Sequence, residues 1–336
     1  MRLAAWTMAA VMAAPVAGWA QTDTRGAEVV AAAREALGGA KVASVTSLSV
    51  EGPFRRLMGQ RQMEGDIELL IALPGKMRRT EEMSFGVPGG PTIERVSTLN
   101  GDESWDEMNN RGGGGPGGGV MMFRGGPGGP GGPDGQRTGR DGQPVDEAAM
   151  ARARARRMQG EMQRWLFALL LSSDKPVTYV GTAEAPDGTA DVIEITDERD
   201  QPMRLFVDQQ THLPLMLTFQ EVRPRMVMMG GPGGPGGPGG RRGGRGQAPP
   251  DGQAPPDGQA PPADRPSPEE MRRRMEAQGP PPPVTVAMHF SDYQKVDGVL
   301  LPHSITQTVD NQPSEEWTVE KYKVNPKLKA DAFEKK

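Results

Sequence analysis

The residues that most often carry chemistry are few in this chain and stand apart from one another. Histidine occurs three times, as His212, His289 and His303, and each stands alone on a predicted strand or turn. A zinc site needs three or four ligands at compatible spacing, so we expect exposed strand histidines and no metal site. Cysteine is absent, which excludes disulfides, thiolate metal ligands and cysteine nucleophiles.

Acidic residues are plentiful, but they occur as adjacent pairs beside predicted turns and strand ends, where solvated charge is normal. Ser304 follows His303 directly, and neighbouring residues of a strand point to opposite faces of the sheet. No convergent set of nucleophile, base and acid is therefore visible, and we expect no catalytic residue, no cofactor and no enzyme activity. The acidic pairs are Glu81-Glu82, Asp102-Glu103, Asp197-Glu198 and Glu315-Glu316.

Methionine is the one chemically unusual residue, with 21 in the chain and two clusters, "VMMF" at 120–123 and "MVMMG" at 226–230. Clustered thioethers can bind Cu(I), which prefers soft ligands. Methionine also lines adaptable apolar surfaces, and this second interpretation is favoured. Copper handling stays a minor alternative that would depend on Met226, Met228 and Met229.

The first twenty residues, "MRLAAWTMAAVMAAPVAGWA", have the layout of a secretory signal peptide: one early charge, an apolar run and a small residue at Ala20. We therefore expect a periplasmic protein, residues 21–336, without stable membrane insertion. The absence of cysteine means that it is not a lipoprotein. The net charge of −4 gives no general attraction to nucleic acid.

Glycine and proline, 46 and 33 residues, concentrate in two blocks at 111–144 and 230–283. The triplet "GGP" repeats too briefly for a collagen helix, and an exported chain does not meet RNA. Both blocks lack the apolar side chains that would offset the entropy of ordering them. We interpret them as disordered inserts within a single domain, with one short helix predicted at 268–278.

Outside the inserts, the pattern is mostly strands with period-two alternation, separated by turn signals such as Asn100-Gly101 and Asp297-Gly298. Helical spacing predicts an N-terminal helix at 25–37 and a long helix at 145–171 whose second half is apolar. A β-bulge is expected between Trp317 and Tyr322, which lie on opposite faces of one strand pattern. The predicted strands are 43–51, 60–73, 76–85, 92–99, 103–108, 177–182, 190–196, 203–208, 213–222, 284–296, 299–309 and 316–324.

This order predicts an α+β fold in which one strongly curved antiparallel sheet of about 11–12 strands wraps around helices as a half-open β-barrel. A sheet that closes incompletely over an apolar helix leaves a groove or internal space of the kind that binds small hydrophobic ligands. Two separate domains fit the order less well, because neither half has enough helices to cover its own sheet.

The segments "IALPGKMRRTEE" and "LNGDESW" resemble the N-terminal half of the LolA-like superfamily of outer-membrane lipoprotein-sorting proteins. Their positions here are Pro74, Lys76, Arg78, Asn100, Gly101 and Trp105. The segments "RLFVDQQTHLPLMLTF", "FSDYQKVDGVLLPHSITQ" and "VEKYKVNPKLKADAFEK" are similar to the C-terminal half of uncharacterised members. The resemblance covers most of the chain except the inserts, and it implies a half-open barrel whose apolar cavity takes acyl chains. Arg78 and Arg79 are candidates by position for the arginine that latches the carrier lid.

We therefore expect a periplasmic carrier of a hydrophobic ligand, such as an acyl chain or a lipoprotein, with contacts to envelope proteins as a further possibility. The alternative is an envelope accessory or scaffold protein with a packed core, and the presence or absence of a cavity separates the two. The candidate cavity residues are Leu69, Ile71, Met83, Phe85, Trp105, Trp165, Leu166 and Leu169.

Overall fold

The computed structural model describes residues 19–58, 61–84, 92–111, 146–185, 188–197, 201–222, 282–329 and 331–335. The predicted inserts, both methionine clusters, the helix predicted at 268–278 and most of the predicted signal peptide lie outside these residues. The chain divides into two compact units, Met1–Gln220 with Thr285–Lys336 and Glu221–Val284. Apart from the terminal residues of two strands, all elements discussed below belong to the first unit.

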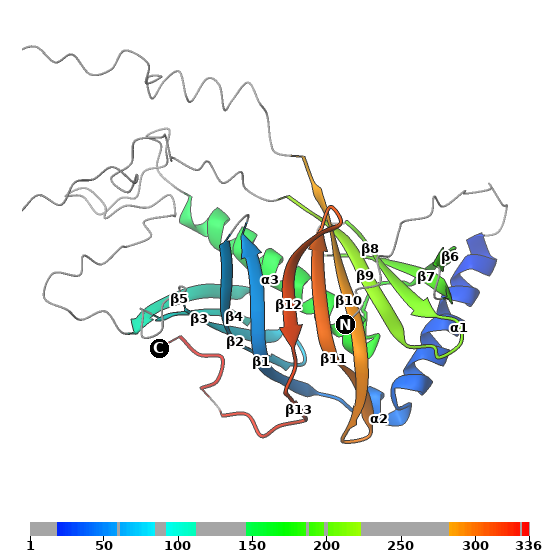
Figure 1. Ribbon diagram of the computed structural model, residues 1–336, viewed down its shortest axis with the longest axis horizontal. Helices are drawn as coiled ribbons and strands as arrows, with labels where there is room; N and C mark the ends of the chain where they lie inside the picture. Colours follow the sequence, from blue (N-terminus) through cyan, green and yellow to red (C-terminus); the bar gives the residue numbers. More distant parts are fainter. Residues whose placement is uncertain are drawn as a thin grey trace, which may run out of the picture. The chain divides into compact units, whose positions relative to one another are not determined.

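The first unit is a single antiparallel sheet with helices packed on it (Figure 1). Its helices are α1 (Trp19–Leu37), α2 (Ala40–Ala43) and α3 (Glu147–Leu170). Its strands are β1 (Ser47–Met58), β2 (Arg61–Ala72), β3 (Lys76–Ser84), β4 (Thr92–Asn100), β5 (Glu103–Arg111), β6 (Thr178–Ala185), β7 (Gly188–Thr196), β8 (Pro202–Asp208), β9 (Pro214–Glu221), β10 (Val284–Val296), β11 (Val299–Val309), β12 (Gln312–Thr318) and β13 (Lys321–Val324).

The strand order is β5-β4-β3-β2-β1-β12-β11-β10-β9-β8-β7-β6, with β13 also pairing β1. The two halves of the chain therefore meet where β1 pairs β12, and β5 and β6 are the two edges. Because these edges do not pair with each other, the sheet is not closed, and this agrees with the predicted half-open barrel. The chain crosses from one edge to the other through α3.

The turn signals placed most strands correctly, and β10 and β11 have the predicted bounds. Where a bulge was predicted after Trp317, the strand instead breaks in two: β12 ends at Thr318 and β13 begins at Lys321, so that the sheet has thirteen strands. The N-terminal helix begins at Trp19 rather than Arg25, because nothing between these residues stops a helix. Among the helices of the described residues, none combines the length and apolarity needed to cross a bilayer.

The first strand was predicted to end at Glu51, before Gly52-Pro53, but β1 continues to Met58. Gly52 lies where β1 changes its partner from β13 to β12. A Cβ at this position would overlap the backbone carbonyl oxygen of Thr318. The glycine is therefore needed for close approach inside a strand, and not for a turn.

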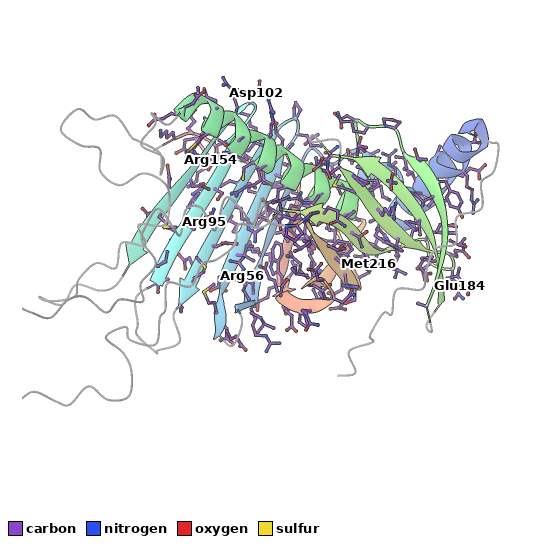
Figure 2. The ribbon with its side chains drawn as sticks, turned by 90° about the horizontal axis from the view of Figure 1, so that it is seen from above. Arg56, Arg95, Asp102, Arg154, Glu184 and Met216 are labelled. Atoms are coloured by element: carbon purple, nitrogen blue, oxygen red, sulfur yellow. The ribbon has the colours of Figure 1, made fainter. Side chains whose placement is uncertain are left out.

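Helix α3 covers the first half of the sheet, and Figure 2 shows it crossing strands β1 to β5. Asp146 caps it by accepting a hydrogen bond from the backbone N–H of Ala149 at 2.9 Å. At the other end, Leu171 has a φ of 52° and closes the helix in the left-handed conformation. Arg34 of α1 donates a hydrogen bond to the Leu171 carbonyl oxygen at 2.7 Å, which ties the end of α3 to α1.

Helix α1 packs mainly against β6, and Figure 1 shows it beside β6 and β7. Val29, Val30, Ala33 and Leu37 form its buried stripe. Close packing is again allowed by a glycine, because a Cβ on Gly26 would come within 2.8 Å of the Val177 carbonyl oxygen. The two halves of the sheet are thus each covered by a helix of their own.

Candidate ligand-binding site

The face of strands β1 to β5 that meets α3, called here the inner face, is defined by the register. Residues directly opposite each other in antiparallel strands share a face. Ile71 of β2 pairs with Leu48 and Met77, and Met77 pairs with Leu99. All four of these side chains are at most 1% exposed, so this end of the inner face is a closed apolar layer.

Six of the eight predicted cavity residues come together here. Leu69 and Ile71 lie on the inner face of β2, and Met83 lies on the same face of β3. Trp165, Leu166 and Leu169 are among the buried residues of α3. The Trp165 ring meets the Trp317 ring of β12 edge to face, with centroids 5.4 Å apart. The apolar half of α3 therefore lies on the sheet as the helical spacing predicted.

The other two predicted residues do not belong to this group. Trp105 pairs with Thr98, and Thr98 pairs with Arg78, which places it on the face of the sheet opposite α3. The sequence does not tell which face of β5 a helix from elsewhere in the chain will cover. Phe85 lies outside the described residues.

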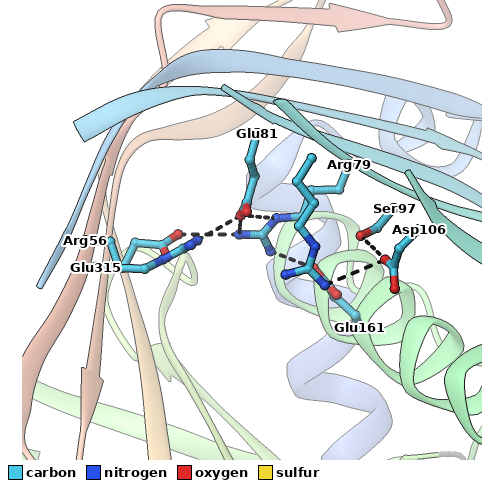
Figure 3. Close-up of polar contacts among 8 residues, drawn as sticks. Arg56, Arg79, Glu81, Ser97, Asp106, Glu161 and Glu315 are labelled. Atoms are coloured by element: carbon cyan, nitrogen blue, oxygen red, sulfur yellow. Dashed lines mark hydrogen bonds and ion pairs between the residues drawn. The ribbon is translucent and has the colours of Figure 1, made fainter. Parts of the chain in front are cut away.

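The inner face is not apolar throughout, because a cluster of charged side chains interrupts it (Figure 3). Arg79 of β3 donates to Glu81 on its own strand and to Glu161 of α3, with nitrogen–oxygen distances of 2.7 Å to each. Arg56 of β1 binds the same Glu81 oxygen at 2.8 Å and Glu315 of β12 at 2.7 Å. The cluster joins three strands to α3, and all five side chains are at least three-quarters buried.

Burial alone would raise the pKa of Glu81, but Arg79 and Arg56 outweigh it and lower this pKa to about 2. Burial likewise opposes ionisation of Glu161, and Arg79 with Arg164 lowers its pKa below the ordinary value. Burial also works against the charge on Arg79, yet the surrounding carboxylates raise its pKa. Glu81, Glu161 and Arg79 are therefore charged at neutral pH, and two arginines hold three glutamates in direct contact.

The prediction of solvated acidic pairs is wrong for Glu81, Glu315 and Asp197, which are buried or nearly so. Asp197 closes the turn after β7 by accepting a hydrogen bond from the Gln201 N–H at 2.9 Å. The signal for Glu81 was present in the alternation of β3, where Arg79 and Glu81 stand between Met77 and Met83 on one face. An arginine and a glutamate two residues apart on an otherwise apolar face indicate an internal ion pair.

The histidines also differ in part from the prediction. His303 is not an exposed strand residue, because its Nδ1 lies 2.8 Å from the Val319 carbonyl oxygen and its Nε2 is buried without a partner. His289 is half-buried, and burial lowers its pKa. His212 is exposed in a turn. Within the described ranges, no three histidine, aspartate or glutamate side chains are grouped so as to hold a metal ion.

An open pocket of about 460 Å³ lies on the opposite, outer face of β1 to β4. It is lined mainly by acidic side chains, and the Glu51 carboxylate in it is paired with Lys323 at 2.7 Å. This pocket lacks the apolar lining of a site for an acyl chain. Its lining residues are Glu51, Gly52, Asp66, Ile67, Glu68, Thr80, Glu82, Glu94, Glu320 and Lys321.

The chain is similar in structure to proteins of the LolA superfamily. A LolA superfamily protein from Nitrosomonas europaea shares 11% identity with it, at a TM-score of 0.44, over 92% of this chain and 97% of that chain. A putative outer membrane lipoprotein-sorting protein domain from Vibrio parahaemolyticus shares 10% identity with it, at a TM-score of 0.42, over 93% of this chain and 97% of that chain.

A DUF1329 family protein from Desulfovibrio piger gives 10% identity and a TM-score of 0.39, over 92% of this chain and 97% of that chain. No family model and no curated protein matches the sequence. At these values the likeness concerns the fold alone. The half-open sheet is defined by the strand order and register given above.

Proposed function

We propose that this protein is a periplasmic carrier that binds a long acyl chain between α3 and the inner face of β1 to β3. One observation carries the proposal: the apolar half of α3 is laid across the inner face of an unclosed sheet and is fastened at its flank by the Arg79–Glu161 ion pair. A helix held in this way can leave the sheet without disturbing any strand pairing. The ligand would then replace the helix side chains.

The energies set a minimum length for the ligand. Uncovering Trp165, Leu166 and Leu169 costs about 1.5–3 kcal/mol for each side chain, or roughly 5–9 kcal/mol together. A chain of 16 carbons gains about 0.8 kcal/mol for each buried methylene, or roughly 12 kcal/mol, whereas 8 carbons gain only about 6 kcal/mol. Because association itself also costs free energy, we expect uptake of long chains only.

A second candidate, a packed envelope scaffold, is favoured by a specific observation. Leu69 and Ile71 are 1% exposed and Leu169 is 2% exposed, so no water-sized space touches these side chains in the state described here. A scaffold needs no more than this packing. A carrier must open, and the difference between the two lies in whether α3 can be displaced.

The test is binding of a fluorescent 16-carbon fatty acid to delipidated protein, followed by competition with unlabelled acids of 8 to 18 carbons. The carrier reading predicts saturable binding that competitors reverse only above about 12 carbons, as the methylene energies require. Glu161→Gln should speed uptake, because it releases the flank of α3. Glu28→Gln, which removes an exposed pair with Arg25, is the matched control and should leave uptake unchanged.

The scaffold reading predicts no saturable binding by wild type or by either variant. Native mass spectrometry of protein purified from a bacterial periplasm, with organic extraction, provides an independent check. A co-purified acylated molecule supports the carrier, and an apo mass together with no probe binding rules it out.

A further inference from the structure

A second group of charges lies between α3 and the edge of the sheet, and its contacts differ from those of the Arg79 cluster. Arg95 of β4 and Arg154 of α3 share a single carboxylate, Asp106 of β5, and each lies 3.6 Å from it. That carboxylate also accepts a hydrogen bond from the Ser97 hydroxyl at 2.6 Å. Neither arginine makes a hydrogen bond with a described residue. Figure 2 shows Arg154 on α3 where the helix passes over the strands, with Arg95 below it.

This rim, defined by Arg95, Arg154 and Arg157, has an excess of positive charge. Arg157 follows Arg154 by three residues and is exposed, so both lie on the same flank of the helix. It makes no ion pair with a described residue. The next acid on this flank, Glu161, is already bound by Arg79. Arg95 and Arg154 therefore share one carboxylate, and most of their N–H donors are unused. Glu81 lies opposite Arg95 across the strands, but it is bound by Arg56 and Arg79.

Two exposed apolar side chains border the rim. Met108 of β5 pairs with Arg95 across the strands and is 64% exposed, and Met150 lies four residues before Arg154 on α3 and is 38% exposed. They are two of only five large apolar side chains exposed among the described residues. The surface therefore places arginines with unused N–H donors directly beside exposed methionine side chains, so that a cationic region borders an apolar one.

We propose that the rim binds the anionic head group of an amphiphile whose acyl chain enters the space under α3. This inference rests on the proposed carrier function and names the class of its ligand. Guanidinium groups form charge-assisted, often bidentate hydrogen bonds with phosphate and carboxylate. Met108 and Met150 contact the start of the chain, and Trp165, 15 residues after Met150 on α3, lies about 22 Å further along the helix axis. The rim thus selects against neutral and cationic amphiphiles of the same length.

The experiment compares hexadecyl phosphate with hexadecanol, each below its critical micelle concentration, as competitors for the 16-carbon probe. The variant pair Arg95→Gln with Arg154→Gln removes two charges from the rim. The control pair Arg152→Gln with Arg156→Gln removes two charges from the same helix, but from exposed arginines on its other side. Inorganic phosphate is included to distinguish a head group from a free anion. Circular dichroism and melting curves confirm that each variant is folded.

We expect the rim variant to bind hexadecyl phosphate roughly tenfold more weakly than wild type and to bind hexadecanol with unchanged affinity. The control variant should bind both compounds as wild type does. Asp106→Asn, which removes the carboxylate that competes for the arginines, should instead increase the affinity for hexadecyl phosphate. Millimolar inorganic phosphate should not displace the probe, since it lacks the chain. Displacement by phosphate alone would overturn the amphiphile and leave only an anion site.

Equal affinity of wild type for the phosphate and the alcohol overturns the head-group site but leaves the carrier function standing. An equal loss in rim and control variants also overturns it, because the attraction would then be the general charge of the helix. Failure of wild type to bind any of these chains overturns the carrier function and the rim together.

Discussion

Replacing Arg79 with glutamine tests whether the internal charge cluster holds α3 on the sheet. Arg79 contacts Glu81, Glu161 and Glu315, so the variant leaves buried carboxylates without their main partner. Burial raises the pKa of Glu81, but Arg79 and Arg56 outweigh it and lower this pKa from 4.5 to about 2, a net shift that corresponds to about 3 kcal/mol. Removing one partner of a buried pair commonly costs about 3–5 kcal/mol. We therefore expect a loss of about 3 kcal/mol in the free energy of unfolding.

The same shift fixes the pH dependence. A carboxylate whose pKa is depressed in the folded state stabilises it above the unfolded pKa, and this contribution is lost as the pH falls toward the folded value. The difference in stability between wild type and Arg79→Gln should therefore be constant above about pH 5. It should shrink between pH 4.5 and about 2, the two pKa values of Glu81.

The assay is urea and thermal unfolding from pH 7 to pH 3, followed by tryptophan fluorescence, because Trp165 and Trp317 lie at the buried interface. A loss of 3 kcal/mol lowers the Tm of a domain of this size by roughly 6–12 °C. Arg55→Gln is the control, since Arg55 pairs with Glu316 at the surface, where such pairs contribute less than about 1 kcal/mol. The reasoning is refuted if both variants lose equal stability, or if the loss at pH 3 equals that at pH 7.

Three further predictions concern packing and organisation. Leu169→Ala should lower the free energy of unfolding by about 2–5 kcal/mol in urea titrations, whereas Met150→Ala on the exposed side of α3 should change it little. Gly52→Ala should destabilise by about 1–3 kcal/mol because its Cβ meets the Thr318 carbonyl, while Gly160→Ala, with no neighbour closer than 3.7 Å, should be neutral or stabilising; equal melting temperatures would contradict this. Deleting residues 230–266 should leave the Tm within a few degrees if the segment is a disordered insert, and a large loss would contradict the single-domain organisation.

Much of the fold could be predicted from local signals alone. Asp297-Gly298 fixed the hairpin of β10 and β11, since few residue pairs other than Asn-Gly and Asp-Gly suit so tight a turn. The apolar spacing from Met158 to Leu169 marked the buried face of α3. The opposite-face positions of Trp317 and Tyr322 marked an irregularity, predicted as a bulge, at the point where β12 ends and β13 begins. Turn chemistry and periodicity are properties of a few neighbouring residues, so the sequence states them directly.

Only the tertiary structure decided which faces and charges meet. Trp105 was expected to line the cavity but lies on the outer face, because α3 covers the opposite face of β5. The alternation of β3 indicates the Arg79–Glu81 pair, but Glu315 is 234 positions after Glu81, and no local pattern tells that it reaches Arg56 and Arg79. The sequence around Gly52 is typical of a strand end, yet the strand continues through it. A glycine is needed there because the backbone of Thr318 approaches closely, and Thr318 comes from the far end of the chain. Periodicity tells that a face is buried, whereas the element that buries it is set by packing between distant segments.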